Sequence, residues 1–254
     1  MDKYNVYQDM SRRTGGEIYL GIVGPVRTGK STFIKRFMEL VVIPEMSDDN
    51  EKVRTIDELP QSADGKTIMT TEPKFIPKEA AVIHFSNQET GKIRLIDCVG
   101  YLVPEAVGAI EEEKERMVKT PWSEEEIPFS KAAEIGTSKV IREHSNLGLI
   151  ITTDGSFGDI PAVNFEEALQ KTVMECEKAG KPFLILVNTS RPDSQETIQF
   201  TKRLEAQYGK TVMAVNCKTM DREDVFRIME QLLADFPITR LNLSGLNFCS
   251  RITG

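Results

Sequence analysis

Long hydrophobic runs are missing from this 254-residue sequence. Its apolar stretches reach about seven residues, well short of the roughly 18–20 that a membrane-spanning helix needs. The first residues, MDKYNVYQDMSRRTGGE, have no apolar core behind their charges, so they are not expected to act as a secretory signal. The sequence therefore predicts a protein that neither crosses a membrane nor enters a secretory pathway.

Paired cysteines and histidine are also scarce. The four cysteines lie far apart, no two of them form a CxxC pair, and neither of the two histidines is close to one. This spacing argues against a disulfide framework and against a zinc site. We therefore expect a cytoplasmic protein with reduced thiols.

Positive charge is in deficit. The 39 acidic residues outnumber the 32 basic ones, which gives a formal net charge of −7. Proteins that bind nucleic acid in general carry an excess of positive charge, so no nucleic-acid partner is expected. The length suits one large domain, or one domain with an appendage.

Short apolar runs alternate with helical patterns along the chain. The runs expected to form buried strands are residues 18–23, 93–97, 147–152, 182–188 and 211–216. Their hydrophobicity is continuous, which is typical of strands covered on both faces of a parallel sheet. Helices are expected over residues 31–41, 130–144, 164–179, 194–208 and 222–235. The alternation predicts an α/β fold with a mostly parallel, doubly wound sheet and helices on both faces.

Helix ends carry recognisable capping residues. Asn164, Ser194 and Asp221 stand where N-caps are expected, and Gly180 and Gly209 where C-caps belong.

Some segments fall outside the regular alternation. Residues 81–85 are expected to form a strand that pairs in a hairpin with residues 93–97. Residues 44–69 and 100–129 are expected to be long loops, and the charge run EEEKER within the second is expected to be a solvated helical face. Residues 1–240 are assigned to one domain, and residues 241–254 to a tail.

The strongest motif follows the first predicted strand. Residues 24–31, GPVRTGKS, match the phosphate-loop pattern GxxxxGK[ST] and open a predicted helix. Backbone N–H groups in such a turn point into one concavity and bind phosphate. The residues expected to bind nucleotide here are Gly24, Pro25, Val26, Arg27, Thr28, Gly29, Lys30, Ser31 and Thr32. Lys30 is expected to reach the β- and γ-phosphates, and the Ser31 hydroxyl to ligate Mg²⁺.

Two further segments complete a predicted Mg²⁺ and γ-phosphate site. Asp97 ends the strand at residues 93–97 and is suited to hold Mg²⁺, as a Walker-B acid does. Gly100, three residues on, brings a backbone N–H close to the γ-phosphate. Thr70 and Thr71 lie in the loop IMTTEP and are expected to sense nucleotide by contacting the metal; either one is a candidate.

The base-recognition segment predicts adenine. A guanine-binding switch protein has Asn-Lys-x-Asp after the strand at residues 182–188, whereas this chain has Asn188-Thr189-Ser190-Arg191. Asn188 is kept as a nucleotide-binding residue. Arg191 is only a donor, so it cannot accept from the N1–H and amine of guanine, and Asp193 is out of register. ATP is therefore predicted over GTP.

Water activation departs from the pattern of small GTPases. They place Gln directly after Asp-x-x-Gly, and here Tyr101 follows. Arg27, in the phosphate loop, is a candidate for supplying positive charge near the β–γ bridge; the alternative is that it is an ordinary surface arginine.

Taken together, these residues resemble the N-terminal NTPase domain of the stage IV sporulation protein A family. The resemblance runs to about residue 237 and rests on long blocks: RRTGGEIYLGIVG, GPVRTGKSTFIKRFMELVV, DELPQSADGKTIMTTEPKF, IRLIDCVGY, TPWSEEEIPFSKAAEIGT and ITTDGSFGDI. It implies an ATPase from a GTPase-like branch of phosphate-loop proteins. By this resemblance, Lys30 and Ser31 bind nucleotide, Thr70 and Thr71 are sensors, and Asp97 is the Walker-B acid.

The resemblance also implies a cellular role. Family members hydrolyse ATP and self-associate into a polymer that forms the basement layer of the spore coat, on the mother-cell side of the forespore surface. A small amphipathic membrane-bound protein recruits them, and other coat proteins join the layer. The family's middle and C-terminal regions, implicated in membrane targeting and polymer contacts, are absent from this sequence.

Other functions remain open at this point. A GTP-dependent switch is the alternative within the enzyme class, and a non-hydrolysing scaffold that keeps ATP as a structural ligand is the alternative outside it. A small-molecule kinase is disfavoured, because residues 44–69 contain a single arginine and much acid where a kinase lid would be rich in arginine.

Overall fold

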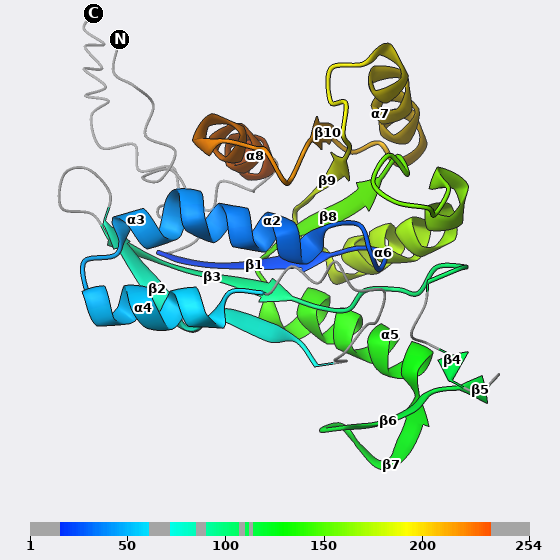
Figure 1. Cartoon of the computed structure of the whole chain (residues 1–254), viewed down its shortest axis with the longest axis horizontal. Helices are drawn as coiled ribbons and strands as arrows, with labels where there is room; N and C mark the ends of the chain where they lie inside the picture. The colour runs from blue at the N-terminus through cyan, green and yellow to red at the C-terminus, as the bar shows by residue number, and fades with distance from the viewer. Residues whose placement is uncertain (1–15, 61–71, 85–89, 107–109, 112–113, 235–254) are drawn as a thin grey trace, which may run out of the picture.

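The computed structural model describes residues 16–60, 72–84, 90–106, 110–111 and 114–234. Its centre is a six-stranded sheet in the order β10-β9-β8-β1-β3-β2 (Figure 1). The parallel strands are β1 (Glu17–Val23), β3 (Thr90–Asp97), β8 (Leu147–Thr153), β9 (Phe183–Asn188) and β10 (Val212–Val215). The edge strand β2 (Lys74–His84) pairs with β3 in the antiparallel sense, as the predicted hairpin requires.

Helices cover both faces of the sheet, which confirms the predicted α/β fold. One face is covered by α2 (Lys30–Phe37), its continuation as a π-helical turn (Met38–Val42), α3 (Ile43–Glu45) and α8 (Arg222–Ala234). The other face is covered by α5 (Phe129–Lys139), its π-helical continuation (Val140–His144), α6 (Glu166–Ala179) and α7 (Gln195–Tyr208). None of the helices in the described ranges is long and apolar enough to cross a membrane.

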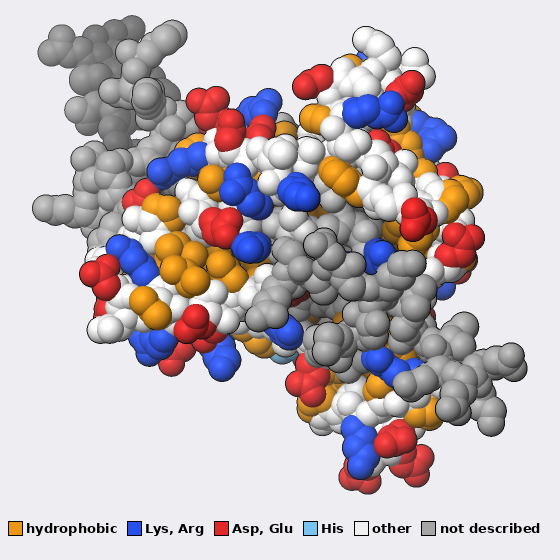
Figure 2. Space-filling view, viewed as in Figure 1, with side chains coloured by type: hydrophobic (Ala, Val, Ile, Leu, Met, Phe, Trp, Pro, Cys, Tyr) orange, Lys and Arg blue, Asp and Glu red, His pale blue; other side chains and the backbone are white. Residues whose placement is uncertain are grey.

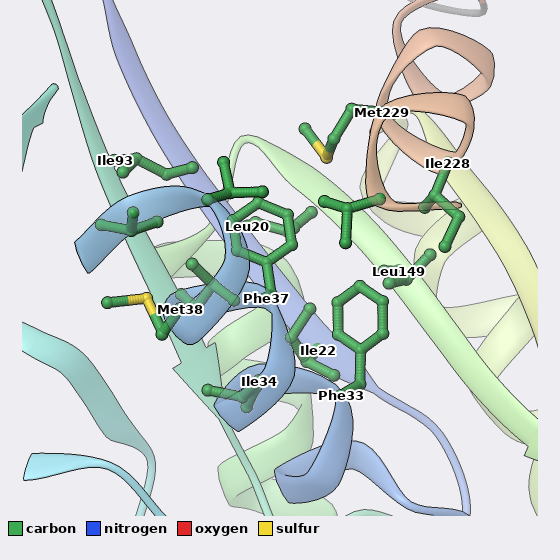
Figure 3. Close-up of a cluster of buried hydrophobic side chains, with 14 of the residues drawn as sticks. Leu20, Ile22, Phe33, Ile34, Phe37, Met38, Ile93, Leu149, Ile228 and Met229 are labelled. Carbon is green, nitrogen blue, oxygen red and sulfur yellow. The ribbon is translucent and has the colours of Figure 1, made fainter. Parts of the chain in front are cut away.

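The larger core lies between the sheet and the pair α2 and α8. Phe33 and Phe37 project from α2 onto Leu20 and Leu149 of the sheet, and Met229 approaches from α8 (Figure 3). Each of these side chains is at most 2% exposed. Burying a large apolar side chain contributes about 1.5–3 kcal/mol, so this cluster holds the first helix firmly against β1. The phosphate loop between them is therefore attached to two rigid elements.

The predicted capping residues are confirmed with one exception. Ser194 and Asp221 each accept a hydrogen bond from the backbone N–H three residues further on. Gly180 and Gly209 adopt the left-handed conformation that ends a helix, with φ of 64° and 60°. The prediction for Asn164 is wrong: it lies inside a short 3₁₀ turn, Ala162–Phe165, that precedes α6.

Residues 44–69 are not only a loop, because they contain the helix α4 (Asp49–Glu58). The Asp48 side chain accepts from the N–H groups of Asn50 and Glu51 and so caps the first turn. Val53 and Ile56 are more than half exposed, and the helix therefore has no apolar stripe of the kind that marks a buried face.

The second long segment forms two small hairpins instead of a loop with a helical face. Of the charge run, Glu111 lies in β4 (Ile110–Glu111) and Lys114 and Glu115 lie in β5 (Lys114–Glu115), so the expectation of a helix is wrong for these described residues. The strands β6 (Met117–Thr120) and β7 (Ser123–Pro128) follow and form an antiparallel hairpin that leads directly into α5.

Candidate nucleotide-binding site

The phosphate loop joins β1 to α2 at the carboxyl edge of the sheet. Gly24, Arg27 and Gly29 have positive φ values of 128°, 62° and 93°. A Cβ on Gly24 would lie 2.3 Å from the carbonyl oxygen of Ile151, so only glycine allows the loop to turn this close to β8. The Thr28 hydroxyl donates to the carbonyl of Pro25 at 3.0 Å and closes the loop on itself.

Lys30 lies under this loop. Its side chain is 5% exposed, and its Nζ donates to the carbonyls of Pro25 at 2.6 Å and Gly24 at 3.3 Å. Burial lowers the pKa of the Lys30 ammonium, an effect that the nearby Asp97 carboxylate opposes. The loop thus holds a buried cation whose partners are neutral carbonyl groups.

Asp97 stands next to the start of α2 because of strand register. Ile22 of β1 lies opposite Asp97 of β3, so the carboxylate emerges beside the phosphate loop. Asp97 Oδ2 accepts from the Ser31 hydroxyl at 2.7 Å, and the buried Oδ1 has no hydrogen-bond partner among the described residues. Burial raises the pKa of this carboxyl group, although the Ser31 hydrogen bond and Lys30 lower it.

This donor set fits Mg²⁺. A hydroxyl and a carboxylate are hard oxygen ligands, and the carboxylate has an orphaned oxygen that a cation would satisfy. Ser31 and Asp97 are thus the described residues that would hold the ion.

Gly100 packs against the same site. Its φ is 92°, and a Cβ there would lie 1.9 Å from the carbonyl oxygen of Gly24 and 2.8 Å from Lys30 Nζ. The backbone after β3 therefore reaches the phosphate loop in a way that any side chain would prevent.

Asn188 holds the other side of the loop. Its Nδ2 donates to the carbonyl of Thr28 at 3.0 Å, and its Oδ1 accepts from the N–H of Cys217 at 3.0 Å. A Cβ on Gly29 would lie 2.4 Å from that Nδ2. This one side chain thus ties the phosphate loop to the ends of β9 and β10.

The residues after Asn188 form a network that the sequence did not reveal. Thr189 is fully buried, and its hydroxyl donates to Asp154 Oδ2 at 2.6 Å. Ser156 Oγ accepts from the N–H of Ser190 at 2.8 Å. The Arg191 guanidinium lies 3.3 Å from the carboxylate of Glu196. The segment that would read a base is therefore fixed from the end of β8, and Asp154, which the sequence analysis did not single out, links the ends of the two strands.

The remaining predicted site residues are Arg27, Thr32, Thr70 and Thr71. Arg27 is exposed at the turn of the loop, and Thr32 follows Ser31 in the first turn of α2. Thr70 and Thr71 lie outside the described residues.

The sequence indicated Tyr101 only as a departure from the glutamine pattern of small GTPases. In the structure, Tyr101 contacts the phosphate loop. Its carbonyl accepts from the N–H of Val26 at 2.9 Å. Its ring packs with Val26, Val103 and Phe165 in a small apolar cluster beside the phosphate loop. No sequence motif announces this contact, because the residues are far apart in the chain.

Comparison with known proteins agrees with this geometry. The family model described as "Stage IV sporulation protein A, ATPase domain" matches residues 1–237. Stage IV sporulation protein A of Bacillus subtilis (strain 168) is 50% identical over 244 residues, which is 96% of this chain and 50% of the relative. The proteins of the same name from Bacillus anthracis and Clostridioides difficile (strain 630) are 48% and 47% identical, over 96% and 94% of this chain.

The chain spans about half the length of these relatives. Since the family model covers nearly all of it, the chain belongs to the stage IV sporulation protein A family and spans the ATPase domain of that family.

Proposed function

We propose that this chain binds ATP with Mg²⁺ and hydrolyses it. The observation that carries the proposal is the meeting of Ser31, Asp97 and Lys30 around one phosphate loop, where the buried Oδ1 of Asp97 has no hydrogen-bond partner among the described residues. Lys30 would exchange its loop carbonyls for phosphate oxygens, which are far better partners for a buried ammonium. Gly100 and the loop N–H groups would hold the terminal phosphate in place, and bound Mg²⁺ would offset the charge that develops on it.

ATP is proposed over GTP because of the segment after β9. Thr189 is buried with its hydroxyl engaged, and Arg191 takes the position of the guanine-reading carboxylate. No residue in that position accepts from guanine, so a purine with an acceptor N1 is the better fit.

At the level of the whole protein, we propose that the nucleotide cycle drives self-assembly of the basement layer of the spore coat on the forespore. Residues 1–240 would act as the NTPase domain. The amphipathic recruiting protein and the other coat proteins are proposed as partners of the full-length protein.

The test is phosphate release with ATP and with GTP, for the parent chain and for Lys30→Ala. Release with ATP alone that Lys30→Ala abolishes supports the proposal. Preference for GTP would show that the reading of Thr189 and Arg191 is wrong, and activity that persists in Lys30→Ala would place catalysis elsewhere.

One observation favours a second candidate, an ATP-bound scaffold without turnover. Tyr101 directs its ring into the apolar cluster with Val26 and Phe165, so it does not orient water in this conformation. Tight ATP binding without phosphate release at any protein concentration would establish the scaffold in place of the ATPase.

A further inference from the structure

A groove of about 380 Å³ separates α5 from α6. Its apolar and aromatic lining residues are Tyr101, Ile135 and the half-exposed Met174. The other lining side chains are Lys131, Glu134, Ser138, Lys171, Glu175 and Lys178. The groove lies outside the phosphate site, and the hydrolysis proposed above makes no use of it.

Tyr101 connects this groove to the phosphate loop. Its ring lines the groove, whereas its carbonyl accepts from the Val26 N–H at 2.9 Å. It also directly follows Gly100, which packs against Lys30 and Gly24. A shift of the backbone at Gly100 would thus move one wall of the groove.

The rim of the groove offers cations to a partner. Glu175 is already engaged, because Arg142 Nε and Ser138 Oγ donate to it at 2.7 Å and 2.8 Å. Among the residues that the structure describes, Lys131 and Lys171 pair only with carboxylates on their own helices, at 3.6 Å and 2.9 Å, and are about half exposed. Exposed ion pairs of this kind contribute little to stability, so these lysines can exchange them for carboxylates of a binding partner.

A complementary acidic element is present elsewhere on the same chain. The β6–β7 hairpin projects away from the body of the molecule (Figure 1), and several acidic side chains lie at the outer end of that lobe beside a basic one (Figure 2). Glu124, Glu125 and Glu126 are consecutive and exposed on β7. In the described part of the chain, none of the three forms an ion pair.

We propose that the α5–α6 groove of one copy binds the acidic β6–β7 hairpin of a second copy. The contact is head-to-tail, since groove and hairpin are different surfaces, and contacts of this type close into rings or continue as filaments. The proposal rests on the proposed function in one respect: Tyr101 makes the width of the groove depend on the nucleotide at Gly100. Association is therefore expected to be stronger with ATP than without nucleotide.

Charge exchange tests the pairing. The groove variant is Lys171→Glu/Lys178→Glu, and the hairpin variant is Glu124→Lys/Glu126→Lys. Sedimentation velocity with ATP at low salt should show that each variant alone associates at least about tenfold more weakly than the parent, because like charges then meet. An equimolar mixture should recover association, because each reversed surface finds its reversed partner on the other chain.

Two controls distinguish the proposed contact between groove and hairpin from general effects of charge on association. Lys202→Glu/Arg203→Glu makes the same charge change on α7 and should associate like the parent. The combined fourfold variant should associate with itself but not with the parent, which only a contact between chains explains. The proposal would be overturned if the parent and the single-surface variants associated equally. It would also be overturned if the mixture did not recover association, or if the parent did not associate at all.

Phosphate release from the same samples keeps the two proposals distinct. None of the substituted residues belongs to the phosphate site, so turnover per molecule below the association threshold should match the parent. Charge-dependent association without phosphate release would leave the groove proposal standing and contradict the proposed ATPase.

Discussion

The Ser31 hydroxyl donates to Oδ2 of Asp97 across 2.7 Å and joins the first turn of α2 to the end of β3. The same carboxylate keeps a buried oxygen, Oδ1, without a hydrogen-bond partner in the described structure. A buried carboxylate oxygen without a hydrogen-bond partner costs stability, so its presence at this point is best understood as a requirement of function.

Asp97→Asn is therefore expected to separate stability from function. Burial raises the pKa of Asp97, so the charged form destabilises the folded chain at neutral pH, and removing the charge should leave the melting temperature unchanged or raise it. Phosphate release with Mg²⁺ should fall by at least about 100-fold. Thermal melts without nucleotide and turnover assays check both outcomes. A large loss of thermal stability would contradict the account of the unpaired oxygen.

Gly100→Ala is expected to weaken nucleotide binding. The added Cβ would overlap the carbonyl oxygen of Gly24 at 1.9 Å and crowd Lys30 Nζ at 2.8 Å, so the phosphate loop must move. Gly158→Ala is a matched control, because its φ is 112° but nothing lies within 4 Å of the added Cβ. Titration of a fluorescent ATP analogue should show at least about tenfold weaker binding for the first variant, a difference of about 1.4 kcal/mol. Equal losses in both variants would mean that backbone strain alone is responsible.

Asn188→Asp tests the link between the phosphate loop and β10. The carboxylate can still accept from the Cys217 N–H, but it loses the donor to the Thr28 carbonyl and places two oxygens against each other. The free energy of unfolding should fall by about 1–3 kcal/mol, and ATP affinity should fall with it. Urea denaturation and analogue binding provide the two measurements. Weaker binding with unchanged stability would assign Asn188 to the nucleotide instead of to the loop.

The sheet and the phosphate loop were predictable because their signals are local. Continuous apolar runs mark β1, β8 and β9, and GPVRTGKS is one uninterrupted motif between a strand and a helix. By contrast, α4 was missed because Val53 and Ile56 are its only apolar residues, and both face solvent. Its sequence therefore has no apolar repeat that would indicate a helix packed on the core. Its only local signal was Asp48, three residues before Glu51, a spacing that favours an N-cap.

The contacts that hold the candidate site together join residues that are distant in the sequence. The sequence predicted Asn188 as a nucleotide-binding residue. It did not reveal that the Asn188 side chain forms hydrogen bonds with Thr28 and Cys217, because the three residues lie in separate segments of the chain. The Tyr101 contact with Val26 likewise requires the register of β1 against β3. Motifs identify residue types at fixed spacing, whereas such bridges are set by tertiary packing.

Alkaline pH is expected to destabilise the chain through its buried thiols. Burial raises the pKa of Cys217 from 9.0 to about 12, and that of Cys176 likewise to about 12. Each thiol stays neutral in the folded chain but ionises in the unfolded one, so its stabilising effect is intact below about pH 9 and is lost as pH rises through the folded pKa. At pH 10 the loss is about 1.4 kcal/mol for each thiol. Urea denaturation at pH 8 and pH 10 measures it, and Cys217→Ala, which has no thiol to ionise, should lose less stability between the two. Parallel losses in both proteins would mean that other groups control the alkaline transition.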